Sequence, residues 1–425
     1  MMNKTSNNPF NTIILGFFLF NVISDVFFKL SQGSEIVIAG FKIIGLFFIF
    51  KSFFSIKNRN IYLFSSSYSN LLSLYKIICA IMIVRGYMID YQYVWISTAG
   101  MINYHFFQPF YILCYLMPYV SYIDYRFYDY GYFMRLAYKC AKISVFLFVV
   151  AFPFLIKESS QRLLSSDSFS GNVSESSWIL PYTIFNLFVF FFLLGKYQTK
   201  VERNWILGGF ISVLLGGLLL GRRGRCAIMV LYSLFPIYMW IQKFRRGKFF
   251  VGLFALMCAV ALTFLLFNTS LTSFITSRGT TDTRSGVDVA LMDQMDSWEV
   301  VFGKGLNGRY YYPLREDDYL KGWRYGSETG FFNLILKGGL LMAFVYIALL
   351  IIPAFKGMFR SNNLLCKASG YFIFVSLLEL YPFGWLMFDL KFLIIWMGVV
   401  ICMNPQVRYM NDEQVYELFF ERKIS

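Results

Sequence analysis

Arginines, one glutamate and a run of aromatic residues around one long polar interval are the side chains best suited to chemistry in this chain. The interval covers residues 269–327, about 60 residues rich in Arg, Asp, Gly and Tyr, and an apolar stretch lies on each side of it. Long loops are uncommon in compact proteins unless they carry function. We therefore expect the chemistry to lie in this loop.

A first group of basic residues stands between two apolar stretches upstream of the loop. It consists of Arg222, Arg223 and Arg225 with flanking glycines, and Arg278 at the start of the loop extends it. Guanidinium groups bind phosphate oxygens in pairs, and the attraction is strengthened at a low-dielectric membrane boundary. These four arginines are therefore predicted to bind a pyrophosphate. The alternative is that the local topology differs and the cluster is a cytoplasmic membrane anchor.

Two further residues of the loop are candidates for catalysis. Arg284 lies shortly after Arg278, and Glu328 closes the loop in SETGFFNLILKGGLL, where an apolar helix is expected to begin. A carboxylate at a helix N-terminus is often only a helix cap. The functional interpretation is that Glu328 accepts a proton from a sugar hydroxyl, while Arg284 neutralises charge on the leaving group.

The middle of the loop combines glycines with aromatic and charged residues. Residues 303–308 spell GxGxxG, but no βαβ unit surrounds them, so a tight turn that approaches a ligand or a helix end is expected. Residues 287–301 show helical spacing and predict one amphipathic helix near the membrane surface. The aromatic and charged mixture that follows suits sugar binding, or else a membrane-interface aromatic belt. The predicted sugar-binding residues are Arg309, Tyr310, Trp323, Arg324 and Tyr325.

The elements that must position these residues are membrane helices. The chain has 425 residues, of which 57% are hydrophobic and only 15% charged, whereas soluble proteins carry about a quarter charged residues. The apolar runs are continuous and near 20 residues long, which predicts an all-α polytopic bundle rather than a β-barrel. We expect about twelve transmembrane helices, over 10–29, 36–55, 62–84, 97–123, 140–157, 178–195, 205–221, 226–242, 249–268, 329–353, 367–386 and 388–404.

Basic residues set the expected orientation. They concentrate in alternate connections, which places both termini in the cytoplasm and the large loop on the outer side of the membrane. The expected parts are a bundle of nine spans (1–268), the large outer loop (269–327), three more spans (328–404) and a cytoplasmic tail (405–425) that could form a short amphipathic helix. The net charge of +15 is dispersed over many connections, so nucleic-acid binding is not expected.

The histidines and cysteines exclude other chemistry. The single histidine, His105, lies in an apolar stretch, and none of the seven cysteines lies in the large loop. A histidine-rich metal site, a Ser-His-Asp triad and a disulfide framework are therefore not expected. We predict no metal and no cofactor.

The order of these features resembles the O-antigen polymerase and ligase group of bacterial polysaccharide proteins. The similarity covers about residues 205–345: an arginine cluster, an arginine opening a large loop, a helix ending in FGKGLNG, and a helix opening SETGFFNLILKGGLL. Ligases of this group typically carry His where Glu328 stands, which favours a Wzy-type polymerase. The paired RX10G motifs of some polymerases are not recognisable at Arg278 or Arg284.

The resemblance implies a membrane glycosyltransferase. Such an enzyme joins undecaprenyl-pyrophosphate-linked repeat units at the periplasmic face of the bacterial inner membrane, so the large outer loop would be periplasmic. It uses no nucleotide or metal and works with a chain-length regulator as partner. Two alternatives remain: a ligase that transfers polymer to lipid A core, and a lipid-linked oligosaccharide flippase or transporter. A transport path would use charged residues inside the spans, namely Lys42, Lys76, Glu379, Asp389 and Lys391.

Overall fold

The described part of the chain is mostly helical, with four helices long and apolar enough to cross a membrane. These are α3 (Glu35–Ser55), α4 (Ser66–Ile89), α6 (Tyr130–Leu164) and α15 (Gly330–Phe359). The coarse expectation of a mostly helical protein with helices that could span a membrane is confirmed. The computed structural model describes residues 8–23, 35–56, 65–89, 107–164, 182–219, 223–243, 285–313, 322–327, 329–380 and 384–421.

Other helices pack around these four. The amino-terminal helix α1 (Pro9–Phe17) runs on into a π-helical turn, η1 (Phe18–Ile23). The expected span 226–242 is divided into two helices at Leu234, because Pro236 in the first turn of the second helix has no N–H to continue the pattern. The remaining helices of this part are α7 (Tyr182–Leu193), η7 (Gly195–Tyr197), α8 (Lys200–Leu219), α9 (Arg223–Ser233) and α10 (Phe235–Lys243).

In its described part, the expected span over 97–123 is not one continuous α-helix. Residues 109–112 form a turn, and Leu113–Tyr122 forms a 3-10 helix, η4, followed by a second, η5 (Tyr125–Phe127). Pro118 lies inside η4, where its ring and missing N–H disfavour an α-helix. Residues 97–106 and the expected span 249–268 lie outside the described residues.

Two short helices near the carboxyl end form a hairpin. Helix α16 (Leu364–Leu378) has 15 residues and α17 (Leu390–Met403) has 14, so each is about 20 Å long against a hydrocarbon core of about 30 Å. Their connection packs on protein: the N–H of Phe388 donates to Pro109 O at 2.7 Å. Irregular backbone at membrane depth is tolerated where protein covers it in this way.

The tail after residue 404 docks on the bundle, and the expected short amphipathic helix is confirmed. It contains α18 (Pro405–Tyr409) and α19 (Asp412–Phe419). Asp412 accepts hydrogen bonds from Lys196 Nζ at 2.6 Å, Tyr197 Oη at 2.5 Å and the N–H of Leu364 at 2.7 Å. Phe420 stacks on Tyr197 with 4.7 Å between ring centroids. The tail therefore joins α16 to η7.

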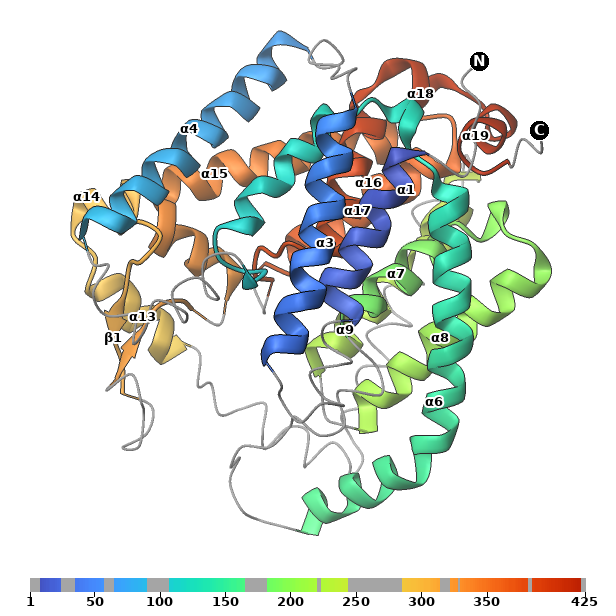
Figure 1. Cartoon of the computed structure of the whole chain (residues 1–425), viewed down its shortest axis with the longest axis horizontal. Helices are drawn as coiled ribbons and strands as arrows, with labels where there is room; N and C mark the ends of the chain where they lie inside the picture. Colours follow the sequence, from blue (N-terminus) through green and yellow to red (C-terminus); the bar gives the residue numbers. More distant parts are fainter. Residues whose placement is uncertain are drawn as a thin grey trace.

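The described part of the large loop gathers beside the ends of α4 and α15, away from α18 and α19 (Figure 1). Where one amphipathic helix was expected over 287–301, the structure has two, α13 (Ser285–Asp293) and α14 (Ser297–Phe302). The break follows from a capping box in which Asp296 caps α14 and Glu299 bonds back to the Asp296 N–H. Strands β1 (Tyr310–Tyr311) and β2 (Trp323–Arg324) pair antiparallel, with Tyr311 opposite Trp323.

Candidate functional site

A break in α15 is the foundation of the candidate site. Gly339 has φ +73°, so the helix loses its regular hydrogen bonds there. The freed carbonyl oxygens of Leu336 and Lys337 accept instead from the N–H groups of Lys304 at 2.7 Å and Gly305 at 2.9 Å. A Cβ atom on Gly339 would lie 2.1 Å from Val301 O. The loop is therefore bonded to the helix at a point that only glycine fits.

The FGKGLNG turn makes the same kind of contact with α4. The N–H of Leu306 donates to Met82 O at 3.0 Å, and buried Asn307 donates from Nδ2 to Gly86 O at 3.1 Å. Tyr111 donates its hydroxyl to Asn307 Oδ1. The expected tight turn against helix ends is confirmed. Because the N–H groups of residues 304–306 are bound to helix carbonyls, this part of the GxGxxG sequence does not offer them to a phosphate.

A cavity of about 180 Å³ opens beside this turn. The Arg309 guanidinium lies 4.1 Å from the centroid of the Trp323 ring, a cation–π contact. Lys304 Nζ lies 3.4 Å from a carboxylate oxygen of Glu299 and donates to Gln294 O at 2.6 Å. An aromatic face beside charged groups and an amide suits a sugar ring. The cavity is lined by Gly86, Glu299, Lys304, Asn307, Gly308, Arg309 and Trp323.

The cavity brings together two of the five predicted sugar-binding residues, Arg309 and Trp323. Tyr310 is fully buried and donates its hydroxyl to Gly326 O at 3.2 Å. Arg324 donates from Nε to Tyr312 O at 3.4 Å. Tyr325 follows β2 and is partly exposed. Sugar binding by these three residues remains a prediction, since they lie outside the described lining of the cavity.

A second set of contacts ties the start of α15 to α13. The Ser327 hydroxyl donates to Asp288 Oδ1 at 2.7 Å, and the Thr329 hydroxyl donates to the same oxygen at 3.2 Å. In sequence, these two residues flank Glu328, and Asp288 follows Arg284 by four positions. Asp288 therefore joins the two chain neighbours of Glu328 to α13, the helix that begins directly after Arg284.

Most of the predicted charge-bearing residues are not described. Glu328, Arg284, Arg278 and Arg222 lie outside the described residues. The remaining two, Arg223 and Arg225, are in the first turn of α9, where the backbone alone is described. Their roles in catalysis and pyrophosphate binding therefore remain predictions.

The charged residues considered for a transport path are bound to protein groups. Buried Lys391 forms an ion pair with buried Glu379. Asp389 caps α17 by accepting from the Phe392 N–H at 3.0 Å. Lys42 donates to Phe107 O at 2.9 Å, and Lys76 donates to the Tyr122 hydroxyl. The three lysines therefore connect separate elements, whereas Asp389 caps its own helix. The part of the chain that the structure describes holds no cluster of metal-ligating side chains.

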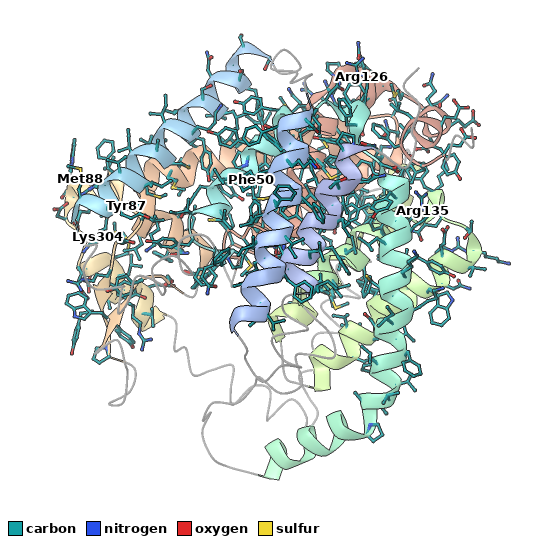
Figure 2. All side chains as sticks on the ribbon, viewed as in Figure 1. Phe50, Tyr87, Met88, Arg126, Arg135 and Lys304 are labelled. Carbon is teal, nitrogen blue, oxygen red and sulfur yellow. The ribbon has the colours of Figure 1, made fainter. Side chains whose placement is uncertain are left out.

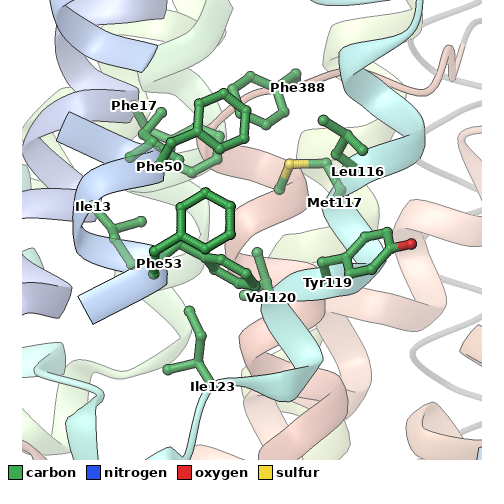
Figure 3. A pocket seen from close by; sticks show the side chains of 12 residues that line it. Ile13, Phe17, Phe50, Phe53, Leu116, Met117, Tyr119, Val120, Ile123 and Phe388 are labelled. Atoms are coloured by element: carbon green, nitrogen blue, oxygen red, sulfur yellow. The ribbon is translucent and has the colours of Figure 1, made fainter. Parts of the chain in front are cut away.

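A second cavity, of about 240 Å³, lies between α1, α3 and η4 (Figure 3). Aromatic and aliphatic side chains line it, among them Phe17, Phe53, Met117 and Phe388. Walls of this kind hold hydrocarbon rather than water or a polar reactant. The first cavity, which has charged and amide groups in its lining, is therefore the better candidate for a polar ligand.

Sequence reasoning missed Glu299, Asn307, Lys337 and the docking role of Asp288. The capping-box spacing of Asp296 and Glu299 is visible in the sequence and could have placed the start of α14. No local pattern marks Asn307 and Lys337, because their partners lie far away in the chain: Gly86 for Asn307, and Gly308 for Lys337 Nζ at 3.0 Å.

Comparison with known proteins finds no family model, no curated protein and no solved structure that matches this chain.

Proposed function

We propose that this protein is a membrane glycosyltransferase that polymerises lipid-linked sugar repeat units at the periplasmic face of a bacterial inner membrane. The observation that carries the proposal is the cavity at the end of α4, with Arg309 stacked on Trp323 beside the Glu299–Lys304 pair. Aromatic faces pack on sugar C–H surfaces, while charged groups and amides bond hydroxyls. The twelve-span topology, with both termini cytoplasmic, belongs to this proposal.

In the proposed reaction, the acceptor is the non-reducing sugar of one lipid-linked repeat unit and the donor is a glycan on undecaprenyl pyrophosphate. A hydroxyl oxygen of the acceptor attacks the anomeric carbon of the donor, and the bond from that carbon to the pyrophosphate oxygen breaks. Glu328 takes the hydroxyl proton, and Arg284 with Arg278 and the 222–225 arginines neutralises the departing pyrophosphate. The Asp288 contacts to Ser327 and Thr329 support this assignment.

Deletion of the gene in its own host, followed by gel analysis of surface polysaccharide, tests the proposal. A polymerase predicts lipid A core that carries a single repeat unit, with the ladder lost. Bare core with accumulated lipid-linked polymer would indicate the ligase instead. Bare core with single lipid-linked units trapped on the inner leaflet would indicate the flippase. An unchanged ladder would remove the protein from this pathway.

Plasmid-borne variants then test the assigned residues. Wild-type protein should restore the ladder, whereas Glu328→Gln and Arg284→Ala at equal expression should not. Normal polymer from both variants would refute the assigned catalytic residues.

A further inference from the structure

Helix α14 has an exposed apolar face. Trp298, Val301 and Phe302 are 67%, 40% and 39% exposed. They stand at positions i, i+3 and i+4, so they share one face of the helix. The rings of Trp298 and Phe302 lie 4.5 Å apart. A contiguous group of exposed large apolar side chains is typical of a surface that contacts protein or membrane.

This face lies where two candidate membrane helices end. Val301 O packs on Gly339, after which α15 continues as an apolar helix whose Phe344 is 65% exposed. On the other side, the FGKGLNG turn that follows α14 is bonded to Met82 of α4. The apolar surface of α4 ends at Met88, which is 81% exposed (Figure 2). Gly86, two residues earlier, lines the same cavity as Lys304.

We propose that α14 lies in the bilayer interface on the side of the large loop, with Trp298, Val301 and Phe302 in contact with lipid. Lipid is the expected cover because the face continues the exposed apolar surfaces of α4 and α15, which are long and apolar enough to be surrounded by hydrocarbon. Tryptophan is favoured at this depth, since its ring is apolar and its N–H is polar. This assignment is independent of the reaction proposed above.

The assignment has a consequence for the cavity. Glu299 follows Trp298 in α14 and lines the cavity, and consecutive positions of a helix point about 100° apart. Lipid contact on one face therefore holds the cavity at the depth of the lipid headgroups. A ligand carried on a membrane lipid would reach it without leaving the bilayer surface.

Depth-dependent fluorescence of the full chain in lipid nanodiscs tests the proposal. The variant Trp298→Cys would be labelled with the fluorophore NBD after Cys226 and Cys258 are replaced by Ala, because the other five cysteines are buried. Asp293→Cys, at the exposed end of α13, is the matched control. At position 298, we expect emission shifted to the blue, quenching by 5-doxyl phosphatidylcholine and protection from aqueous iodide. At position 293, we expect the reverse.

Two outcomes would overturn the proposal. Equal iodide quenching at the two positions would show that α14 is in water. Protection from iodide at position 298 without quenching by the nitroxide lipid would show that protein, such as a second copy of this chain, covers the face. Monodisperse elution and a wild-type thermal midpoint for each labelled variant establish that the fold is intact. Neither outcome depends on whether the protein is a polymerase.

Discussion

The ammonium group of Lys337, buried in α15, donates a hydrogen bond to Gly308 O at 3.0 Å, and the two residues are 29 positions apart in the sequence. Its own carbonyl oxygen accepts from the Gly305 N–H at 2.9 Å. One residue of a candidate membrane helix thus holds both ends of the turn that borders the cavity. The large loop is therefore fixed to the bundle at the site itself.

The break at Gly339 predicts a strong effect of a single methyl group. Gly339→Ala should destabilise the protein by about 2 kcal/mol or more, because a non-glycine residue at φ +73° and ψ −178° costs about 1–3 kcal/mol and the new Cβ would also overlap Val301 O. The measurement is the thermal unfolding midpoint in detergent. Gly40→Ala is the control, since a Cβ there meets nothing within 4 Å and alanine is favoured in a helix. Equal midpoints for the two variants would contradict the role of the break.

The cavity predicts a specific loss of saccharide binding. Trp323→Ala should weaken binding about tenfold, because it removes a stacking surface and the cation–π contact with Arg309, together about 1–2 kcal/mol. The measurement is a fluorescence titration with oligosaccharide released from the host's own surface polysaccharide. Trp205→Ala, a partly exposed position on α8, should bind like wild type. If Trp323→Ala also bound like wild type, the cavity would not be the sugar site.

The buried ion pair between Glu379 and Lys391 predicts non-additive stability effects. Lys391→Met alone should cost about 3–5 kcal/mol, because it leaves the Glu379 carboxylate buried without its partner. The double variant Glu379→Gln, Lys391→Met should recover most of that loss. Thermal midpoints of the single, double and control variants give the coupling, with exposed Lys200→Met as control. A double variant no more stable than Lys391→Met would argue against direct pairing.

The tail contacts predict a pH dependence at acid pH. Burial alone would raise the pKa of the Asp412 carboxyl, but hydrogen bonds from Lys196, Tyr197 and the Leu364 N–H outweigh it and hold the pKa below its usual value. A carboxyl with a lowered pKa stabilises the fold fully above its ordinary pKa of about 3.9. That contribution is lost as the pH falls through the lowered value. Asp412→Asn should therefore lower the thermal midpoint at neutral pH.

The same variant should also flatten the fall in the thermal midpoint between pH 5 and pH 2. Glu413→Gln, at an exposed neighbouring position, should follow the wild-type curve. Parallel curves for Asp412→Asn and wild type would show that ionisation of Asp412 contributes nothing to the pH dependence of stability.

The sequence by itself determined the class of protein and several local features. Continuous apolar stretches predict helices over 36–55 and 329–353, and the structure has α3 and α15 there. These predictions succeed because hydrocarbon offers no hydrogen-bond partners, and an α-helix satisfies its backbone N–H and C=O groups within one segment. The glycines of 303–308 likewise predict a turn, because positive φ at Gly303 and Gly305 needs no side chain.

Only the tertiary structure decided where these elements meet. The cavity combines Gly86, residues 299–309 and Trp323, which lie on separate segments of the chain. Their meeting depends on the break at Gly339. The break frees the carbonyl oxygens of Leu336 and Lys337, which accept hydrogen bonds from the turn. Gly338 and Gly339 look alike in the sequence, yet only Gly339 has positive φ. Such a break depends on hydrogen-bond partners from distant segments, and local patterns of residue type do not specify those partners.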